Sequence, residues 1–543
     1  MAGTWNPLGN QPPVAIDTML LLTDGSVMCH EYEDSGTITP NWWRLTPDAF
    51  MNYANGTWHL LTPMPANAPV GMNGPVNAPL YFASAVLRDG RVFVAGGEYN
   101  VSGAASVDLL ACSIYDPVTD SWANLPTPPG WTNIGDAPTC VLPDGRVLIG
   151  NINTVETAIL DPVTRTWSTG GNKHDTSSEE SWTLLPDGTI IVAEVNNHPH
   201  AEKYLIANNQ WIKAGSTPPG HDLVLNEPGV SIEIGPAVLM PDGRVFCAGA
   251  TGHTAVYLPP LHPTQPGTWI PGPNFPVSGG SLMRAFDAPA SLLPSGNVLC
   301  AVGPLNGGWS GPPTEFFEFD GAHLHAQANP GSAAGAPTFN ARLLLLPSGE
   351  VLYSNCTDTI EIYNPAGGPQ AAWRPRITEV PRHLHPGGRF RLHGLQLNGL
   401  SQAVAYGDDA QMATNYPLVQ LRGPAGTGMV FCRTFDHSTM AVATGNAVHH
   451  THFEVPAHLP HGEYELVVIA NGIISKPVAV HVGEEKKEHE HHHHEEPEKK
   501  HEHPREPEEF GGSLTLQLKL PVSLERRGRR RPWVEAVLEQ AEE

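Results

Sequence analysis

Apolar and polar residues alternate in short runs over the first two-thirds of the chain, and a recurring tight turn joins these runs. Examples are VLRDGRVFV from Val86, VLPDGRVLI from Val141 and LLPSGNVL from Leu292. Asp-Gly or Ser-Gly between apolar runs predicts a β-hairpin, because the turn needs a positive φ that glycine adopts at little cost. Seven such turns occur, 43 to 65 residues apart: Asp24-Gly25, Asp89-Gly90, Asp144-Gly145, Asp187-Gly188, Asp242-Gly243, Ser295-Gly296 and Ser348-Gly349. The chain is therefore expected to contain seven similar all-β units.

A tryptophan followed by a Pro- or Gly-rich exit marks a second strand pair in most units. These residues are Trp58, Trp122, Trp167, Trp211 and Trp269. The sixth unit has AHLHAQANP from Ala322 instead, and the seventh has no such strand after it. Trp5 in GTWNPLGNQPP supplies the missing strand, and the closed ring leaves no open sheet edge. This period is typical of kelch-type blades, so the pattern predicts a seven-bladed β-propeller over residues 1–372, with the tryptophans packing between strands.

The pattern changes after residue 372. Residues 373–482 contain about seven strand-like runs and are predicted to form a β-sandwich of immunoglobulin type. Residues 483–512 are rich in Glu and His, which predicts a disordered linker. Residues 513–543 combine an alternating strand-like run, an arginine cluster and a short helical pattern.

Charge and composition narrow the classes of partner. The 543 residues carry a formal net charge of −25, which argues against a nucleic-acid partner. No run of 18 apolar residues occurs, so no membrane span is expected. The start, MAGTWNPLGN, lacks the regions of an ordinary signal peptide, and the seven scattered cysteines are interpreted as buried and reduced. These features favour a cytoplasmic location or non-classical export and leave the compartment open.

Seven kelch-like blades followed by a sandwich resemble galactose oxidase and the wider copper-radical oxidases. The segments YGDDAQMATNYPLVQL from Tyr406, RTFDHSTM from Arg433 and LPHGEYELVVIANGIISKP from Leu459 carry this resemblance, which covers residues 4–482. It implies a copper ion held by two tyrosines and two histidines, with a cysteine cross-linked to one tyrosine.

The positions that match those copper-site residues hold other side chains in this chain. They are Phe339, Asn340, Gln411, Asp136 and Tyr81. Phenylalanine has no phenolic oxygen and asparagine is a poor copper ligand, whereas copper(II) prefers imidazole. We therefore expect the copper-radical cofactor to be absent and assign no catalytic residue.

Counting nine or ten residues back from each turn glycine predicts a ring of side chains at one mouth of the propeller. The count gives Ile16, with Asp17 one place on, and Tyr81, Asp136, Glu179, Glu233, Asp287 and Asn340; Arg284 lies close by, and Gln411 from the sandwich completes the predicted ligand-binding residues. Converging carboxylates repel unless a cation, a proton or Arg284 offsets them. This favours Ca²⁺ or a sugar-like or cationic ligand. The alternatives are acids on solvated loops or, with paired carboxyls, a hydrolase.

Histidines form further candidate groups. His198 and His200 are spaced like a ligand pair but are interpreted as loop residues, and His449, His450 and His452 as surface residues of a strand. The tail histidines favour weak binding of Zn²⁺, Ni²⁺ or Cu²⁺, within a segment otherwise interpreted as a solvated tether. They are His489, His491, His492, His493, His494, His501 and His503.

Together these features predict a non-catalytic binding or scaffold protein with a sugar-like or protein ligand at the propeller mouth, with or without a cation. Two alternatives stay open at this point. One is an enzyme, either a divergent oxidase with a rebuilt metal site or a carboxylate-based hydrolase. The other is a subunit recruited to an assembly by a protein partner that binds residues 513–543.

Overall fold

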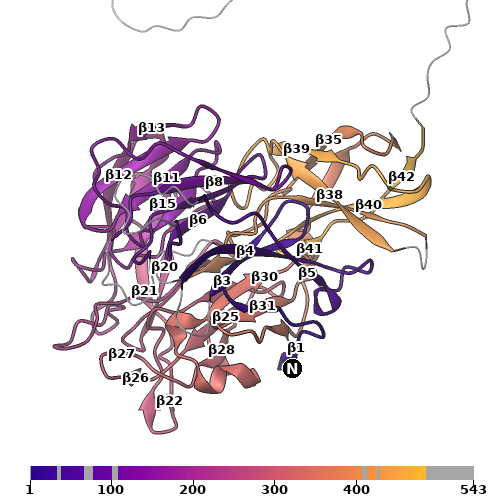
Figure 1. Ribbon diagram of the computed structural model, residues 1–543. Coiled ribbons are helices and arrows are strands. Elements are labelled where there is room, and N and C mark those ends of the chain that lie inside the picture. The colour runs from indigo at the N-terminus through magenta and orange to yellow at the C-terminus, as the bar shows by residue number, and fades with distance from the viewer. Residues whose placement is uncertain are drawn as a thin grey trace, which may run out of the picture. The chain divides into compact units, whose positions relative to one another are not determined.

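Seven antiparallel sheets form the blades of a β-propeller in the computed structural model (Figure 1). The structure describes residues 2–32, 38–65, 77–100, 108–406, 412–424 and 428–484. Six of the sheets have four strands, and the sheet of the sixth blade carries a fifth strand from the C-terminal region. The predicted seven-bladed propeller is confirmed. The linker predicted at 483–512, the tail histidines and the element predicted at 513–543 lie outside the described residues, apart from Gly483 and Glu484.

The first four blades follow one another along the chain, each with its strands in sequence order from the inside outwards. They are β2 (Ala15–Leu21), β3 (Val27–Tyr32), β4 (Ile38–Thr46) and β5 (Thr57–Leu60); β6 (Ala83–Val86), β7 (Val92–Ala95), β8 (Cys112–Asp116) and β9 (Ser121–Asn124); β10 (Thr139–Val141), β11 (Val147–Asn151), β12 (Thr154–Asp161) and β13 (Thr166–Thr169); and β14 (Thr183–Leu184), β15 (Ile190–Ala193), β16 (His200–Leu205) and β17 (Gln210–Ser216). Short 3₁₀ turns, η1 (Tyr53–Asn55) and η2 (Ile206–Asn208), precede β5 and β17.

The last three blades complete the ring. They are β18 (Ala237–Leu239), β19 (Val245–Ala248), β20 (Thr254–Leu258) and β21 (Thr268–Pro271); β24 (Ala290–Leu292), β25 (Val298–Val302), β28 (Glu315–Phe319) and β29 (Leu324–Ala326); and β30 (Arg342–Leu345), β31 (Val351–Ser354) and β32 (Glu361–Asn364) with β1 (Thr4–Pro7). Two small hairpins lie in the loops around the sixth blade, β22 (Val277–Ser278) with β23 (Ser281–Leu282) and β26 (Leu305–Asn306) with β27 (Trp309–Ser310). The 3₁₀ turns η3 (Gly331–Gly335) and η4 (Thr338–Asn340) precede β30.

The seven turn glycines all adopt the left-handed backbone that the sequence pattern requires. Their φ values lie between 77° and 92°. In each turn a backbone bond closes the hairpin, as from the Leu87 N–H to the Arg91 carbonyl at 2.8 Å. Each turn joins the innermost strand of a blade to the second strand of the same blade, so the predicted hairpins are confirmed.

The N-terminal strand closes the ring, as predicted. β1 pairs with β32, with Trp5 opposite Tyr363. The Trp5 indole N–H donates to the Ala328 carbonyl of the neighbouring blade at 2.7 Å. Trp58, Trp122, Trp167 and Trp269 make the same kind of bond to the preceding outer-strand exit, at 2.6 to 3.0 Å. The tryptophan series therefore joins neighbouring blades.

A second set of strands follows the propeller after η5 (Ala371–Trp373). It comprises β33 (Arg376–Glu379), β34 (His383–Leu384), β35 (Arg389–Leu395), β36 (Val404–Ala405), β37 (Leu418–Arg422), β38 (Met429–Phe435), β39 (Val448–Glu454), β40 (Gly462–Ala470), β41 (Ile473–Ile474) and β42 (Val478–Val482). Except for β36, these strands pair with one another and enclose their own apolar core. The immunoglobulin-type arrangement and the boundary at residue 372 stay predictions, and residues 1–485 form one compact unit.

The C-terminal region packs against the ends of the blades that carry the glycine turns. The Thr434 N–H donates to the Thr23 carbonyl at 3.0 Å and the Met440 N–H to the Pro143 carbonyl at 2.9 Å. β36 pairs with β24, the innermost strand of the sixth blade, with Ala405 opposite Ala290. The Leu184 N–H also donates to the Gln402 side chain. Residues 402–406 therefore reach the inner strands from the turn side, and the opposite mouth is the one predicted to carry a site.

The surroundings of the cysteines agree with their interpretation as buried, reduced side chains. All seven are free thiols and all are buried. Burial raises the pKa of the Cys29, Cys247 and Cys300 thiols well above the usual range, so they stay protonated and pack as small apolar side chains. Among the described residues, no helix is both long and apolar enough to cross a membrane.

Candidate functional site at the propeller mouth

The predicted mouth residues of the propeller lie at or just before the starts of the innermost strands, at the end opposite the glycine turns. Asp17 lies in β2 at a register shift between Ile16 and Met19. The other predicted residues of the propeller lie in the connections that lead into the innermost strands of the remaining blades, where Arg284 forms an isolated bridge with Gly303. Because all seven innermost strands start at this end, the mouth gathers side chains from segments far apart in sequence.

A strained backbone recurs at this mouth. Tyr81, Glu179 and Asp287 each lie nine residues before a turn glycine, and their φ values are 53°, 56° and 48°. Left-handed backbone costs a residue with a side chain roughly 1–2 kcal/mol. Such strain persists where the surrounding structure enforces it, and it clusters at binding and catalytic sites. Three blades therefore share one left-handed backbone position at this mouth.

A buried ion pair lies on one side of the mouth. The Arg342 guanidinium at the start of β30 lies 3.3 Å from the Asp17 carboxylate, and both side chains are fully buried. Burial alone would raise the pKa of Asp17, but the charge of Arg342 and the bond with His30 outweigh it and hold that pKa at about 2. Arg342 also donates to the Phe339 carbonyl at 2.8 Å. Asp17 is therefore an ionised carboxylate held in place by a cation.

Two tyrosines flank this ion pair. The Arg342 guanidinium lies 4.2 Å from the ring centre of Tyr406 and 5.8 Å from that of Tyr81. The Tyr406 hydroxyl donates to the Phe339 carbonyl at 2.8 Å. Burial raises the pKa of Tyr81 well above its usual value, so its phenol stays protonated. The pair and its two rings form a rigid polar platform.

Cys356 joins the same group from the seventh blade. Its thiol donates weakly to the Asp17 carboxylate at 3.8 Å and to the Asn340 carbonyl at 3.7 Å. Burial, followed by the nearby Asp17 charge, raises the pKa of this thiol well above the ordinary range. The cysteine is therefore a neutral packing group and not a thiolate ligand or nucleophile.

Carboxyl groups gather on the other side of the mouth. Burial, and then the charge of Asp287, raises the pKa of Glu233 to about 8. Ser231 donates to Glu233 at 2.7 Å, and a side-chain hydrogen bond joins Glu233 to Glu179. Two carboxyl groups form such a bond only when one of them is protonated. The mouth therefore combines an ionised carboxylate, Asp17, with a carboxyl pair that holds a proton near neutral pH.

The remaining predicted residues have different surroundings. Arg284 donates to the Ala250 carbonyl at 3.1 Å and, among the described residues, forms no ion pair, so the cation that meets a mouth carboxylate is Arg342. Asp136 is buried after the positive-φ Gly135. Gln411 lies outside the described residues. In the described part of the chain, the ligand atoms of no three mouth carboxylates lie within 4.8 Å of one another, and the predicted calcium ion stays a prediction.

Arg342, Tyr406 and Cys356 were not predicted from the sequence as mouth residues. Arg342 had a readable signal, because it is a charged residue at the head of the apolar run RLLLL. Tyr406 belongs to the C-terminal region, and nothing in the spacing of the blades places it in the propeller. Cys356 has a φ of 59°, which no local pattern foretells.

The histidine groups of the sequence analysis fall outside the mouth contacts. His198 bonds to Asp222 at 2.5 Å, whereas His200 bonds to Ser216 at 2.9 Å, so they face different partners. His449, His450 and His452 lie on β39 of the C-terminal region, where His450 pairs with His393. In the part of the chain that the structure describes, neither group forms a three-residue metal cluster.

Comparison with known proteins supports a kelch-type propeller. No family model matches the chain. A segment of 136 residues, 25% of this chain, is 31% identical to the kelch-like protein terF of Aspergillus terreus, of which it spans 26%. A segment of 127 residues, 22% of this chain, is 26% identical to human kelch-like protein 30, of which it spans 21%.

Solved structures show a weaker likeness. Virginiamycin B lyase from Staphylococcus aureus aligns with 67% of this chain and 98% of its own length, at 10% identity and a TM-score of 0.42. We draw nothing further from a similarity this low. The segments shared with kelch-like proteins and the seven-bladed ring together support a place for this chain among the kelch-type propeller proteins.

Proposed function

We propose that this protein is a non-catalytic binding propeller whose mouth holds a hydroxyl-rich, sugar-like ligand. The observation that carries the proposal is the mouth itself, where the positive-φ residues Tyr81, Glu179 and Asp287 lie together with a carboxyl that holds its proton near neutral pH and with a buried ion pair. Binding sites of this kind need a few polar groups that are fixed before the ligand arrives.

The groups at the mouth suit hydroxyls. The Tyr81 phenol and the protonated carboxyl of the Glu179–Glu233 pair donate hydrogen bonds, and the remaining oxygens of that pair accept them, whereas Asp17 is fully buried and pairs with Arg342. A hydroxyl both donates and accepts, so alternating acceptors and donors match a polyol better than they match a bare cation. Arg342 is paired with Asp17, so its positive charge offsets the negative charge of that buried carboxylate.

An exposed aromatic side chain completes the proposed site. Trp309 lies on the hairpin β26–β27 and is 57% exposed. The same hairpin accepts a backbone bond from the Ser231 N–H through the Gly308 carbonyl at 3.1 Å, and Ser231 in turn holds Glu233. A flat indole face suits the apolar face of a sugar ring, so this hairpin joins an aromatic platform to the carboxyl side of the mouth.

The catalytic alternatives fit these contacts less well. Phe339 contributes only its backbone carbonyl to the mouth, as acceptor for Tyr406 and Arg342. Glycosidases that use two carboxyls need them about 5–10 Å apart, whereas Glu179 and Glu233 are in hydrogen-bond contact. An oxidase with a rebuilt copper site would show stoichiometric copper and a radical absorption band.

A glycan array probed with the full chain tests the proposal. We expect neutral oligosaccharides to bind, and Trp309→Ala and Glu179→Gln to weaken the best of them about tenfold or more. Leu261→Ala is the control, because this side chain is 96% exposed on a loop between β20 and β21. Binding of basic peptides in place of oligosaccharides, or equal binding by all variants, would overturn the sugar-site proposal.

A further inference from the structure

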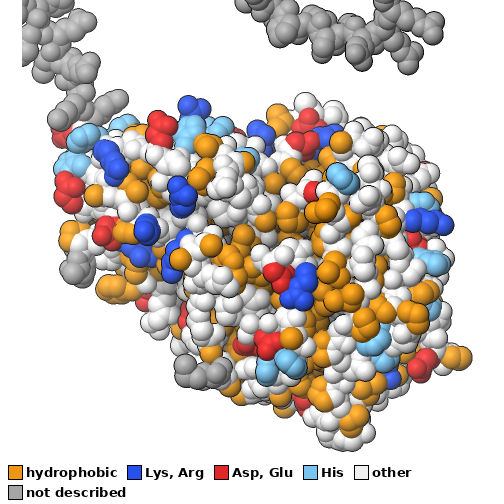
Figure 2. Space-filling view, turned by 180° about the vertical axis from the view of Figure 1, so that it is seen from behind, with side chains coloured by type: hydrophobic (Ala, Val, Ile, Leu, Met, Phe, Trp, Pro, Cys, Tyr) orange, Lys and Arg blue, Asp and Glu red, His pale blue; other side chains and the backbone are white. Residues whose placement is uncertain are grey.

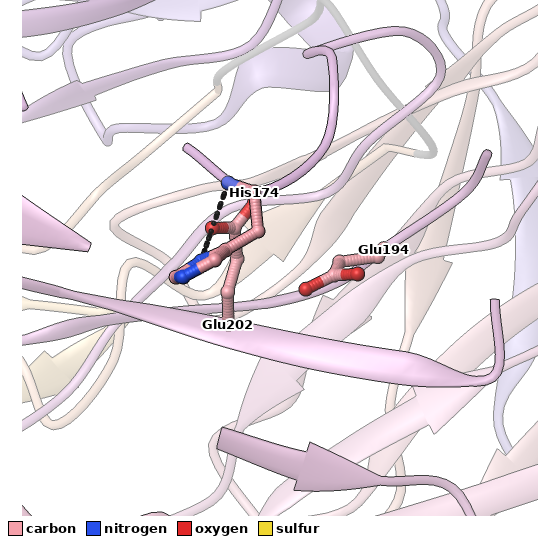
Figure 3. Close-up of side chains that lie close together, drawn as sticks. All are labelled: His174, Glu194 and Glu202. Carbon is pink, nitrogen blue, oxygen red and sulfur yellow. Dashed lines mark hydrogen bonds and ion pairs between the residues drawn. The ribbon is translucent and has the colours of Figure 1, made fainter. Parts of the chain in front are cut away.

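A second polar cluster lies where the third blade leads into the fourth (Figure 3). His174 comes from the connection between β13 and β14, Glu194 follows β15, and Glu202 lies in β16. Glu194 and Glu202 are almost fully buried, whereas the His174 side chain is 37% exposed. In Figure 3 the Glu194 carboxylate points toward the other two residues from the opposite side. None of the three belongs to the mouth contacts described above.

Trp211 does not make the hydrogen bond that the other outer-strand tryptophans make to the preceding blade. Five outer-strand tryptophans donate to a carbonyl of the preceding blade, but the Trp211 indole N–H has no hydrogen-bond partner among the described residues. The Lys173 ammonium lies 5.1 Å from the Trp211 ring centre instead. The segment that follows the outer strand of the third blade therefore carries a polar cluster, and the other blades have no need of such a cluster to join their neighbours.

Carboxyl groups outnumber ammonium groups in this cluster. Lys173 is fully buried and contacts Glu180 at 2.6 Å and Glu202 at 2.7 Å. Burial raises the pKa of Glu180 to about 8, so this carboxyl holds its proton near neutral pH and the Lys173 charge is left chiefly to Glu202. Among the described residues Glu194 forms no ion pair, and a proton or a divalent cation would offset the cost of burying its charge.

We propose that His174, Glu194 and Glu202 bind one first-row divalent cation of the Zn²⁺ class. One ligand atom from each of the three residues lies within 4.8 Å of the others. The His174 Nδ1 and the Glu202 Oε2 share a hydrogen bond at 3.0 Å, which a cation would replace, and two ligands of a tetrahedral zinc ion lie about 3.3 Å apart. An imidazole with two carboxylates suits such an ion, and a water completes the fourth position.

The neighbouring contacts orient these ligands. Lys173 holds the other oxygen of Glu202, so the Oε2 stays directed toward His174. Asn197 donates to the Glu194 Oε2 at 2.5 Å. Outer contacts of this kind fix the orientation of metal ligands and are typical of metal sites.

A bound cation would contact the same loop that carries one of the mouth residues. The connection between β13 and β14 carries His174 and, five residues later, Glu179. Tying His174 to β16 and to the end of β15 would restrict this loop. The site therefore supplies a structural clip beside the mouth, and the inference holds whether or not the mouth binds a sugar.

Zinc binding to the full chain tests the inference once the tail histidines are replaced. A background variant with the tail histidines changed to Asn removes their competing sites and keeps the chain length. Equilibrium dialysis against Zn²⁺, read by elemental mass spectrometry, should give one zinc per chain. His174→Ala should weaken this binding about 100-fold, and Co²⁺ should give tetrahedral absorption bands that the same change abolishes.

Two further variants separate ligand loss from misfolding. His200→Ala is the matched control, because His200 lies in the same blade and bonds to Ser216. It should bind zinc as the background variant does. Glu194→Gln keeps the size of the side chain and should weaken zinc binding while the metal-free thermal midpoint stays within a few degrees. Absence of zinc from the background variant, or unchanged affinity in both His174→Ala and Glu194→Gln, would refute the site.

Discussion

At the scale of single residues, Arg342 organises the mouth. It is fully buried and it meets Asp17, the Phe339 carbonyl and the rings of Tyr406 and Tyr81. Counting back from the turn glycines led to Tyr81 and, one place after the counted Ile16, to Asp17, because the same turn recurs in each blade. The same count missed Arg342, since its partners come from other blades and from the C-terminal region.

Removing the Arg342 charge should destabilise the fold. Arg342→Met leaves Asp17 buried without its cation, and breaking a buried pair in this way costs about 3–5 kcal/mol. The thermal midpoint should fall by several degrees at neutral pH. Asp17→Asn combined with Arg342→Met should recover part of the loss, and a single variant as stable as the parent would contradict the assigned pairing.

The carboxyl pair predicts a dependence of stability on pH. Burial raises the pKa of Glu233 from 4.5 to about 8 in the folded chain. The folded state therefore binds this proton more tightly, and the resulting stability is present below pH 4.5 and is lost as pH rises through 8. Glu233→Gln should remove this loss, so its thermal midpoint should fall less than the parent's between pH 6 and pH 9. Parallel profiles for the two proteins would show that Glu233 titrates normally.

At the scale of elements, the repeat was readable because each blade depends on local chemistry. Asp-Gly and Ser-Gly turns need a positive φ, and all seven have it. The strand β1 could also be predicted, because the seventh blade lacked an outer strand. The insertion of β36 beside β24 could not, since Val404 and Ser291 are far apart in sequence and no repeat links them. The conformations of the mouth loops are likewise set by contacts between blades.

Two turn glycines should respond differently to substitution. An added Cβ at Gly25 would lie 2.1 Å from the Phe431 ring of β38, whereas at Gly243 it would meet nothing within 4 Å. Both positions have a positive φ, so Gly243→Ala should cost about 1 kcal/mol from backbone strain alone. Gly25→Ala should cost clearly more, because Phe431 must also move. Thermal unfolding compares the two, and equal losses would argue against the packing of β38 on this turn.

At the scale of the whole molecule, the two ends of the propeller have different roles. The C-terminal region covers the end with the glycine turns and sends residues 402–406 to the inner strands. The opposite mouth carries the polar groups. On the face drawn in Figure 2, basic side chains are interspersed with acidic and histidine side chains on an otherwise largely neutral and apolar surface. The mouth opposite the glycine turns is the end at which we propose ligand binding, and the C-terminal region packs on the other end.

The most direct test of the central claim is the affinity of the full chain for the best neutral oligosaccharide from the array, measured by calorimetry. The matched pair is Asp287→Asn at the mouth and Asp320→Asn, a carboxylate that bonds to His325 on the outer part of the sixth blade. The account predicts about tenfold weaker binding for Asp287→Asn and no change for Asp320→Asn. Equal affinity of the two variants would contradict a ligand site at the propeller mouth.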